Sequence, residues 1–278
     1  MQAFSKFEGL GNDFMVVDRR ASGVDVTAEQ ARAWCDRRRG VGGDGVLALL
    51  PSGKALARMV VHNADGSIAE MCGNGLRCAV KFLLDGLAGG ADRVAVETGA
   101  GVLECEARRE HGRVVEVEVA MGPARLQAGN LPPGAAGSPW IRAELPGHPG
   151  LRGTAVNLGN PHLVLWNVPT VRAAELGPVL ELHPAFRERT NVEFVARAGD
   201  GLDVTVWERG CGLTLACGTG ACAAAVDAVL AGELPAGSWL PVRLPGGPLA
   251  IRVAADLSGV WMRGPVRHVF DGVLPDAP

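Results

Sequence analysis

The sequence carries one short element twice, and this repeat constrains the fold more than any other feature. Residues 72–75 read Cys-Gly-Asn-Gly and residues 217–220 read Cys-Gly-Thr-Gly, a shift of 145 positions. The same shift places the strand-like run MVVHN, which ends at Asn63, over VTVWE, which ends at Glu208. Self-similarity at one spacing indicates duplicated structural units.

Two further matches extend the repeat. A shift of 146 aligns VETGAGVL (96–103) with VRLPGGPL (242–249), and a shift of 148 aligns LGNDFMVV (10–17) with LGNPHLVL (158–165). Each match is weak alone, but all four occur in the same order along both halves. The chain is therefore predicted to fold as two homologous domains.

The domain boundary is expected near Met121, ahead of the Pro- and Gly-rich stretch 129–140. A length of 278 residues suits two domains of about 140 residues each. We expect an N-terminal half over 1–120 and a C-terminal half over 121–278. The tail, from about 265 to 278, is a segment that can return to the first half.

Short β-branched runs bounded by Gly and Pro predict strands. They are FMVVD, VLALL, MVVH, VAVET and VEVEVA in the first half and HLVLW, VEFVA, LDVTVW and LPVRL in the second. After each CGxG comes the one strongly helical segment of its half, and residues 27–39 predict a further amphipathic helix behind a Thr N-cap. The fold class is therefore α+β: two pseudo-symmetric domains, each a strand layer wrapped around a central helix. An active site is expected in the cleft between such domains.

Composition excludes several functional classes. Hydrophobic residues make up 47% of the chain, yet no apolar run approaches the roughly 18 residues of a membrane span, and no signal peptide opens the sequence. A net charge of −3 argues against a nucleic-acid partner. The seven cysteines include no CxxC pair, which argues against structural zinc and thioredoxin chemistry. We expect a cytoplasmic protein with reduced thiols, no bound metal and no membrane or nucleic-acid partner.

The cysteines divide into two groups. Cys72 and Cys217 sit at predicted helix starts among glycines, where unpaired N–H groups and the helix dipole favour a thiolate and lower the thiol pKa. The same N–H groups can hold a carboxylate. The others are expected to be small core residues: Cys35, Cys78, Cys105, Cys211 and Cys222.

Two equivalent thiols suit a particular reaction. One thiolate removes a proton from one face of a carbon while the opposite thiol delivers a proton to the other face. This general acid–base chemistry inverts a stereocentre without a cofactor. Helix N-termini aimed at an adjacent carboxylate would stabilise the charge that develops in the transition state.

Several motifs resemble those of the diaminopimelate epimerase family, over nearly the whole chain and in the same order. They are FSKFEGLGNDF, HNADGSIAEMCGNGLRC, LGNPH, ERTNVEF and WERGCGLTLACGTGAC. The related proline racemases and hydroxyproline epimerases share paired cysteines, but they resemble CGHG at the first one. The resemblance implies interconversion of L,L- and meso-diaminopimelate, in lysine and peptidoglycan-precursor biosynthesis, without pyridoxal phosphate or metal.

The resemblance also implies a role for each matching residue. Cys217 would be the base for the L,L isomer and Cys72 the acid, with roles exchanged in reverse. Glu208 would hold the reacting ammonium, and His162 would support the site. The reacting carboxylate would be bound by backbone N–H groups of Gly73, Asn74, Gly218 and Thr219. The distal amino-acid head would be read by Asn12, Asn63, Asn160, Asn191 and Arg209.

Two local departures qualify the resemblance. The segment GVGGDG (40–45) matches G-x-G-x-x-G, but it follows a helix and precedes a strand, the reverse of a dinucleotide-binding unit. Some relatives have Gln where this chain has Gly45, which removes a side-chain contact there. Phe270 stands where relatives often have Tyr, in a part of the family that resembles a dimer contact. A homodimer is expected, without a hydroxyl-mediated contact from Phe270.

Two other functions fit parts of the pattern. A racemase of another amino acid would use the same thiols, but Arg209 and the asparagines would then have no distal head to bind. A dithiol redox or peroxide-sensing protein would use Cys72 and Cys217, but it would not need duplicated binding residues around each thiol. Activity on diaminopimelate distinguishes the three possibilities.

Overall fold

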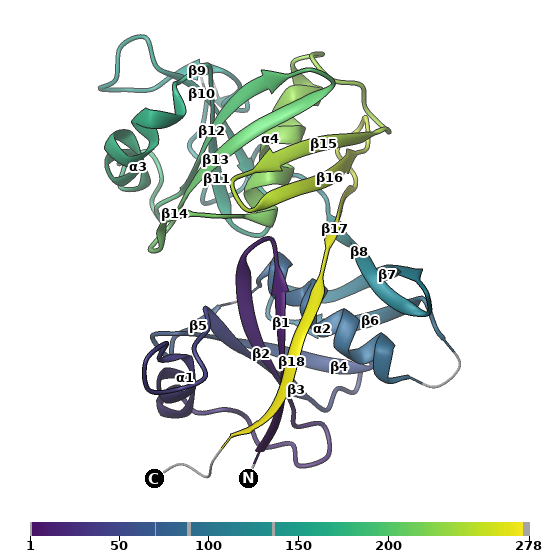
Figure 1. Cartoon of the computed structure of the whole chain (residues 1–278). Coiled ribbons are helices and arrows are strands. Elements are labelled where there is room, and N and C mark those ends of the chain that lie inside the picture. Colours follow the sequence, from purple (N-terminus) through teal and green to yellow (C-terminus); the bar gives the residue numbers. More distant parts are fainter. Residues whose placement is uncertain (1, 70, 88–89, 135–136, 275–278) are drawn as a thin grey trace. The chain divides into compact units, whose positions relative to one another are not determined.

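A computed structural model describes residues 2–69, 71–87, 90–134 and 137–274. The chain divides into two compact units (Figure 1). Unit 1 contains residues 1–120 and 263–278, and unit 2 contains residues 121–262. The C-terminal strand thus belongs with the N-terminal half of the chain, and Glu70, which precedes the first repeated element, lies outside the described residues.

The described residues of unit 1 form mainly strands, with two helices. Its elements are β1 (Gln2–Gly9), β2 (Asn12–Asp18), α1 (Ala28–Cys35), β3 (Gly45–Leu50), β4 (Ala57–Asn63), β5 (Ile68–Ala69), α2 (Gly73–Gly86), β6 (Arg93–Thr98), β7 (Gly101–Glu110), β8 (Arg113–Gly122) and β18 (Arg267–Leu274). β1 pairs antiparallel with β18 and β2, and β2 pairs parallel with β3. β4 pairs antiparallel with β3 and β5 and parallel with β6, after which β6, β7 and β8 form an antiparallel run.

Unit 2 repeats this architecture. Its elements are β9 (Ala143–Glu144), β10 (Arg152–Asn157), β11 (Pro161–Trp166), the 3-10 turn η2 (Thr170–Arg172), α3 (Ala173–Glu181), β12 (Asn191–Ala198), β13 (Gly201–Glu208), β14 (Gly212–Thr214), α4 (Gly218–Leu230), β15 (Trp239–Leu244), β16 (Gly247–Val253) and the start of β17 (Val260–Pro265). β11 pairs parallel with β12, and β13 pairs antiparallel with β12 and β14 and parallel with β15. These pairings match those of β2, β3, β4, β5 and β6 in unit 1.

The strand registers agree with the repeat in the sequence. In unit 1, Phe14 pairs with Gly45, and in unit 2, His162 pairs with Asn191. These partners differ by the shifts of 148 and 146 that align the two halves. The β4–β6 ladder and the β13–β15 ladder also share one register. The predicted fold class is confirmed, because the two halves have the same ladders as well as similar motifs.

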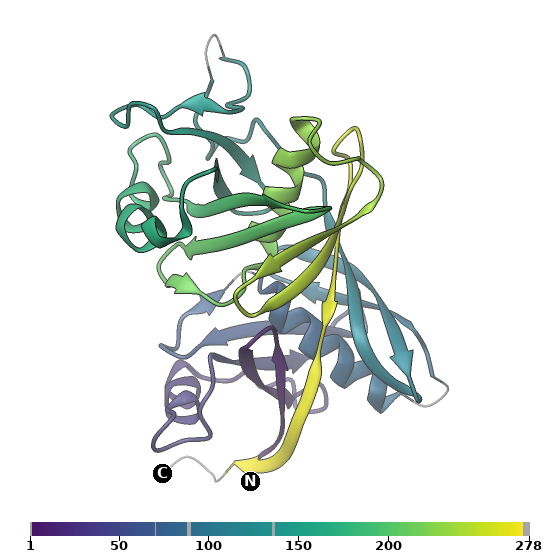
Figure 2. The ribbon, with the colours of Figure 1, turned by 45° about the horizontal axis from the view of Figure 1, so that its top comes forward.

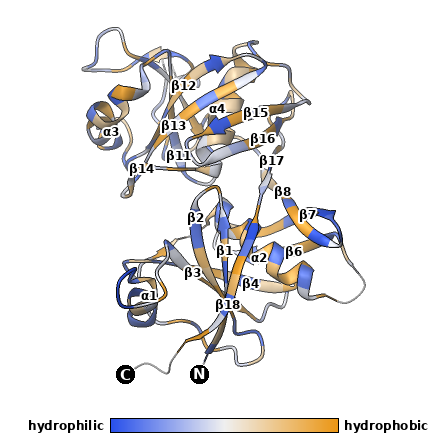
Figure 3. Cartoon of the chain, in the orientation of Figure 1, coloured by the Kyte–Doolittle hydropathy of each residue, from blue (hydrophilic) through white to orange (hydrophobic). Residues whose placement is uncertain are grey.

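Each unit packs its strands around one buried helix (Figure 2). α4 is the more apolar helix: Ala223, Ala224 and Ala225 are fully buried, and its ribbon is mostly pale to deep orange in Figure 3, whereas much of α1 is blue. The exception is Asp227, a fully buried carboxylate that accepts hydrogen bonds from Thr154, Trp166 and Arg142. Small side chains let strands approach α4 closely from several sides, so its buried face extends all round.

The structure differs from prediction at the first helix. The helix expected over 27–39 ends at Cys35, because the Asp36 carboxylate accepts the backbone N–H groups of Arg38 and Arg39 and turns the chain. Its start is as expected, with Thr27 and Gln30 forming a capping box. Among the described residues, no helix is long and apolar enough to cross a membrane.

Candidate active site

Cys72 and Cys217 occupy the same position in their units. Each is the N-cap of the central helix, and each Sγ accepts a backbone N–H from the third residue after it, Gly75 at 3.3 Å and Gly220 at 3.4 Å. A β-carbon at Gly75 would lie 2.9 Å from Leu47, and one at Gly220 would lie 2.9 Å from Glu193. The last glycine of each CGxG therefore allows the capping turn to pack tightly.

In unit 1, polar side chains gather beside the start of α2. Asn74 donates to the Asn12 side-chain oxygen, and Asn12 donates to Asp44 at 3.1 Å. Asn63, the last residue of β4, donates to Ser67 at 2.9 Å. The structure thus brings Asn12 and Asn74 together, while Asn63 lies at the β4–β5 turn.

Arg77 is a feature of unit 1 for which no role was predicted. It lies one turn into α2, is fully buried, donates to the Asn74 oxygen at 2.9 Å and reaches the backbone oxygen of Pro265 at 3.3 Å. This hydrogen bond from Arg77 therefore holds the Asn74 side-chain amide in place. Nothing in the LRC sequence after CGNG indicates this burial, and only the packing of the fold places the Arg77 side chain inside.

In unit 2, Glu208 lies close to Cys217. Glu208 is the last residue of β13, accepts a hydrogen bond from Thr214 at 2.5 Å and also interacts with the Cys217 thiol. Burial raises the pKa of Glu208, while these two donors lower it. The position equivalent to Glu208 in unit 1 is Asn63, so only unit 2 has a carboxylate at this strand end.

His162 forms a buried pair with Glu193. His162 Nδ1 lies 2.7 Å from Glu193 Oε1, and both side chains are fully buried. On its other side, His162 Nε2 lies 2.9 Å from the Asn160 side-chain oxygen. Sequence reasoning assigned no role to Glu193; the signal was a charged residue at a core position of the apolar strand NVEFV.

Asn191 and Arg209 lie together at one edge of unit 2. The Asn191 amide donates to Pro161 O at 3.0 Å and accepts the backbone N–H of Arg209 at 3.0 Å. The Arg209 guanidinium donates to Glu188 O at 2.9 Å. These contacts hold the backbone that leads from Glu208 to Arg209 and so position both side chains.

The prediction that the helix start lowers the pKa of Cys217 is wrong. Burial raises the pKa of the Cys217 thiol well above its ordinary value, and the negative charges of Glu208 and Glu193 raise it further. Hydrogen bonds from Thr219 and Gly220 act in the opposite direction. The prediction from the helix start alone omitted burial and the two carboxylates, which favour the neutral thiol.

The remaining cysteines follow expectation with one correction. Cys35, Cys78, Cys105 and Cys222 are buried, and burial raises the pKa of Cys35 to about 11. Cys211 is instead exposed, because it lies in the tight turn between β13 and β14 and not on a core-facing strand position. Its assignment to the core was wrong.

The segment 40–45 leads directly into β3 and not into a helix, so it lacks the geometry of a dinucleotide-binding loop. A β-carbon at Gly45 would lie 2.6 Å from the backbone oxygen of His62. This chain therefore has no room for a side chain at position 45 without a backbone shift. In unit 2 the equivalent strand position is occupied by Asn191.

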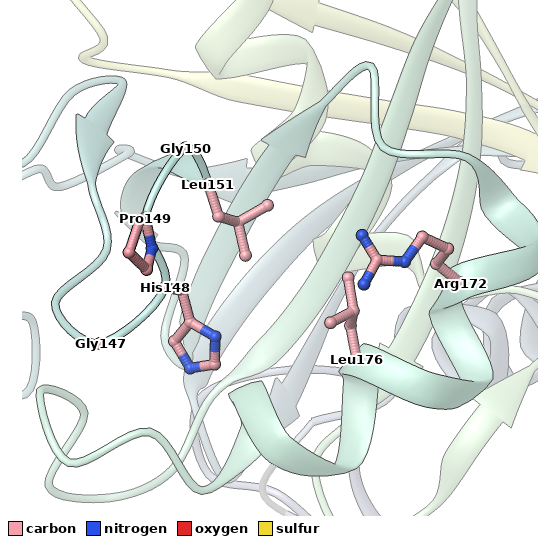
Figure 4. Close-up of a pocket in the computed structure, with 7 residues that line it drawn as sticks. All are labelled: Gly147, His148, Pro149, Gly150, Leu151, Arg172 and Leu176. Carbon is pink, nitrogen blue, oxygen red and sulfur yellow. The ribbon is translucent and has the colours of Figure 1, made fainter.

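Two further features lie apart from these residues. A hollow of about 340 Å³ lies between the 147–151 loop and the helical segment that carries Arg172 and Leu176 (Figure 4). Its lining includes His148 but none of the predicted site residues. Across the part of the chain that the structure describes, no group of three or more His, Cys, Asp or Glu side chains could hold a metal ion.

Solved structures with the same fold include epimerases and racemases. A hydroxyproline epimerase from Agrobacterium vitis matches with a TM-score of 0.69 at 16% identity, covering 98% of this chain and 90% of that one. A probable proline racemase from Agrobacterium radiobacter matches with a TM-score of 0.71 at 17% identity, covering 100% and 94%. At these identities the likeness shows the fold alone.

Sequence relatives are much more similar. Diaminopimelate epimerase from Thermosynechococcus vestitus is 45% identical over 287 aligned positions, covering 98% of this chain and 99% of the relative. Diaminopimelate epimerase from Heliobacterium modesticaldum is 42% identical, covering 98% and 99%. The family model for diaminopimelate epimerase matches residues 4–127 and 154–269. Twin cysteine-capped helices, equivalent ladders and full-length relatives agree: this chain belongs to the diaminopimelate epimerase family, and it is an enzyme of the epimerase class.

Proposed function

We propose that the protein interconverts L,L- and meso-diaminopimelate by a two-base mechanism that uses Cys72 and Cys217. The observation that carries the proposal is their equivalence: each thiol caps a buried helix that begins Gly-X-Gly, in two units with matching ladders. Two thiols in equivalent settings suit a reaction that treats the two faces of one carbon alike. Diaminopimelate is proposed as the substrate because the sequence relatives named above are diaminopimelate epimerases.

In the proposed reaction, the Cys217 thiolate takes the α-proton of the L,L isomer. The C–H electron pair remains on the carbon, and the Cys72 thiol then gives its proton to the opposite face. Cys217 ends as a thiol and Cys72 as a thiolate, so the reverse reaction starts with exchanged roles. No electron is gained or lost overall, and the only bonds that change are C–H and S–H bonds.

The helix starts support binding of the reacting carboxylate. The first N–H groups of a helix have no acceptor within it, and the dipole there favours an anion. Gly73 and Asn74 open α2, and Gly218 and Thr219 open α4. In the proposal, these groups hold the carboxylate and stabilise the charge that reaches it as the α-proton leaves.

Glu208 would bind the reacting ammonium and thereby activate Cys217. The Glu208 charge is one of the causes that raise the Cys217 pKa. An ammonium paired with Glu208 would offset that charge, which favours the thiolate only when substrate is bound. His162 would support this side of the site through Asn160.

The distal head of the substrate would be read by Arg209 and the asparagines. A carboxylate suits the two-pronged guanidinium of arginine, and amides can both donate to and accept from a zwitterion. Asn12 and Asn191 begin strands, Asn63 ends one, and Asn160 directly precedes β11. These residues would distinguish diaminopimelate from an amino acid without a second head.

We further propose that the enzyme is a cytoplasmic homodimer that needs no cofactor. β18 exposes three apolar side chains, with relative exposures of 50% for Val269, 45% for Phe270 and 60% for Val273. Exposed apolar groups of this kind are typical of contact surfaces. Phe270 stacks edge-on against Phe4 at 5.8 Å and would contribute apolar area but no hydroxyl.

The direct test is chiral chromatography of diaminopimelate after incubation with the purified protein. We expect the L,L isomer to approach an equilibrium mixture with the meso isomer without added cofactor. Cys72→Ala and Cys217→Ala should each abolish the reaction, while Cys211→Ala, at an exposed turn, should leave it unchanged. Racemisation of proline with no activity on diaminopimelate would contradict the proposal.

A further inference from the structure

The orientation of one amide fixes the direction of a hydrogen-bond chain in unit 2. Asn160 presents its oxygen to His162 Nε2 at 2.9 Å and its nitrogen to Thr219 Oγ1 at 3.4 Å. An amide oxygen only accepts and an amide nitrogen only donates. His162 Nε2 must therefore carry a proton, and the Thr219 hydroxyl oxygen must act as the acceptor for Asn160.

The Thr219 hydroxyl has one proton, which it can donate while its oxygen accepts from Asn160. Its oxygen lies 3.5 Å from Cys217 Sγ, within the range of a hydrogen bond to sulfur. The Gly220 N–H donates to the same sulfur at 3.4 Å. Both donors favour the charged form of the thiol, since hydrogen bonds to an anion stabilise it.

The other end of the chain holds the proton that this direction requires. His162 Nδ1 and Glu193 Oε1 are 2.7 Å apart, so one proton lies between them while Nε2 keeps its own. Both side chains are fully buried, and burial raises the pKa of Glu193, which favours retention of that proton. The Glu193–His162 pair therefore keeps a proton on His162 Nε2, so that each donor in the hydrogen-bond chain points toward the Cys217 sulfur.

We propose that the buried Glu193–His162 pair orients a one-way chain of donors that ends on Cys217 and stabilises its thiolate. Thr219 is the last link, so its side chain has a role beyond its backbone N–H, and Glu193 is a positioning residue that never touches substrate. Two carboxyl groups, Glu208 and Glu193, lie near the sulfur, and a negative charge on either of them opposes the thiolate. The chain of hydrogen bonds offsets part of this effect, because its last donor stabilises the Cys217 thiolate. Its catalytic meaning rests on the proposed function, in which Cys217 is a base.

Thr219→Val removes the last donor with little change of shape, and Thr219→Ser restores it. The thiolate of Cys217 can be counted by ultraviolet titration, as the difference between each enzyme and the same enzyme carrying Cys217→Ala. We expect Thr219→Val to raise the Cys217 pKa by about one unit, a roughly tenfold loss of thiolate at fixed pH, and Thr219→Ser to return it. Thr205→Val, on β13, is the matched control and should leave the titration unchanged.

Glu193→Gln tests the end of the hydrogen-bond chain that is farthest from Cys217. A glutamine amide can donate to His162 Nδ1 and so preserve the proton on Nε2. The Cys217 pKa should therefore not rise in this variant. An unchanged or lower pKa in Thr219→Val, or a rise in Glu193→Gln as large as that in Thr219→Val, would overturn the inference. The titration is independent of epimerase assays, so activity retained by Cys217→Ala would refute the proposed function without affecting this result.

Discussion

The Cys217 sulfur accepts the backbone N–H of Gly220 at 3.4 Å, and the Cys72 sulfur accepts that of Gly75 at 3.3 Å. The two thiols share a local geometry but not an environment. Glu208 and Glu193 lie near Cys217, whereas the fully buried Arg77 lies one turn into α2, the helix that Cys72 caps. The same capping turn thus serves two thiols whose neighbouring side chains differ.

Arg209→Lys tests the assignment of the distal carboxylate. Lysine keeps the charge but loses the two-pronged donor geometry. Loss of one charge-assisted hydrogen bond should cost about 1.5–3 kcal/mol, which lowers kcat/KM for diaminopimelate roughly ten- to a hundredfold, mostly through KM. Wild-type kcat/KM in this variant would show that Arg209 does not bind the second head.

Gly45→Ala should destabilise the protein, because its β-carbon would lie 2.6 Å from His62 O, a backbone atom. We expect a loss of about 1–3 kcal/mol in the free energy of unfolding. Gly53→Ala is the matched control, since a β-carbon there meets nothing within 4 Å. Urea unfolding of both variants provides the comparison, and equal midpoints would contradict the close packing of β3 against β4.

The pKa of Glu193 predicts a pH-dependent stability. Burial raises this pKa in the folded state, so the folded protein binds the Glu193 proton more tightly than the unfolded chain, whose Glu pKa is about 4.3. The resulting stabilisation is present below about pH 4.3 and is lost as pH rises through the folded pKa. Each unit of raised pKa corresponds to about 1.4 kcal/mol.

Glu193→Gln removes this titration. The variant should therefore gain stability relative to the unsubstituted protein as the pH rises from 4 to 8, measured by urea unfolding at each pH. A stability difference for Glu193→Gln that stays constant with pH would contradict the raised pKa.

Phe270→Asp tests the proposed dimer contact on β18. A charge on a buried apolar contact is costly, so the variant should sediment as a monomer at concentrations where the unsubstituted protein sediments as a dimer. Phe270→Tyr should remain dimeric, because the ring is kept. A dimeric Phe270→Asp variant would show that the dimer contact lies elsewhere. A monomeric unsubstituted protein would show that no such contact forms.

Much of the fold could be predicted because duplication and alternation are local signals. The shifts that align the two halves also align Phe14 with His162 and Gly45 with Asn191 in the strand ladders. β7 and β18 were not predicted, since neither contains a β-branched run: β7 alternates charged with apolar residues, and β18 is interrupted by Asp271 and Gly272. α3 was missed because Pro178 and Gly177 interrupt its helical pattern.

The helix-capping geometry of the two repeated cysteines was predictable, but the electrostatics around Cys217 were not. The capping positions of Cys72 and Cys217 follow from the CGxG pattern. The raised pKa of Cys217 does not, because it depends on burial of the thiol, on Glu208 and on Glu193, which lies 24 residues away in sequence on β12. The burial of Arg77 also depends on contacts with the distant Pro265.

Isotope transfer tests the two-base mechanism most directly. If Cys217 and Cys72 act on opposite faces, the proton that arrives at the carbon is not the one that left. Starting from pure L,L-diaminopimelate in D₂O, the first product should carry deuterium at the inverted carbon while the remaining substrate stays largely unlabelled. Product that retains the substrate's own hydrogen in a single turnover would contradict the mechanism, because one base would then serve both faces.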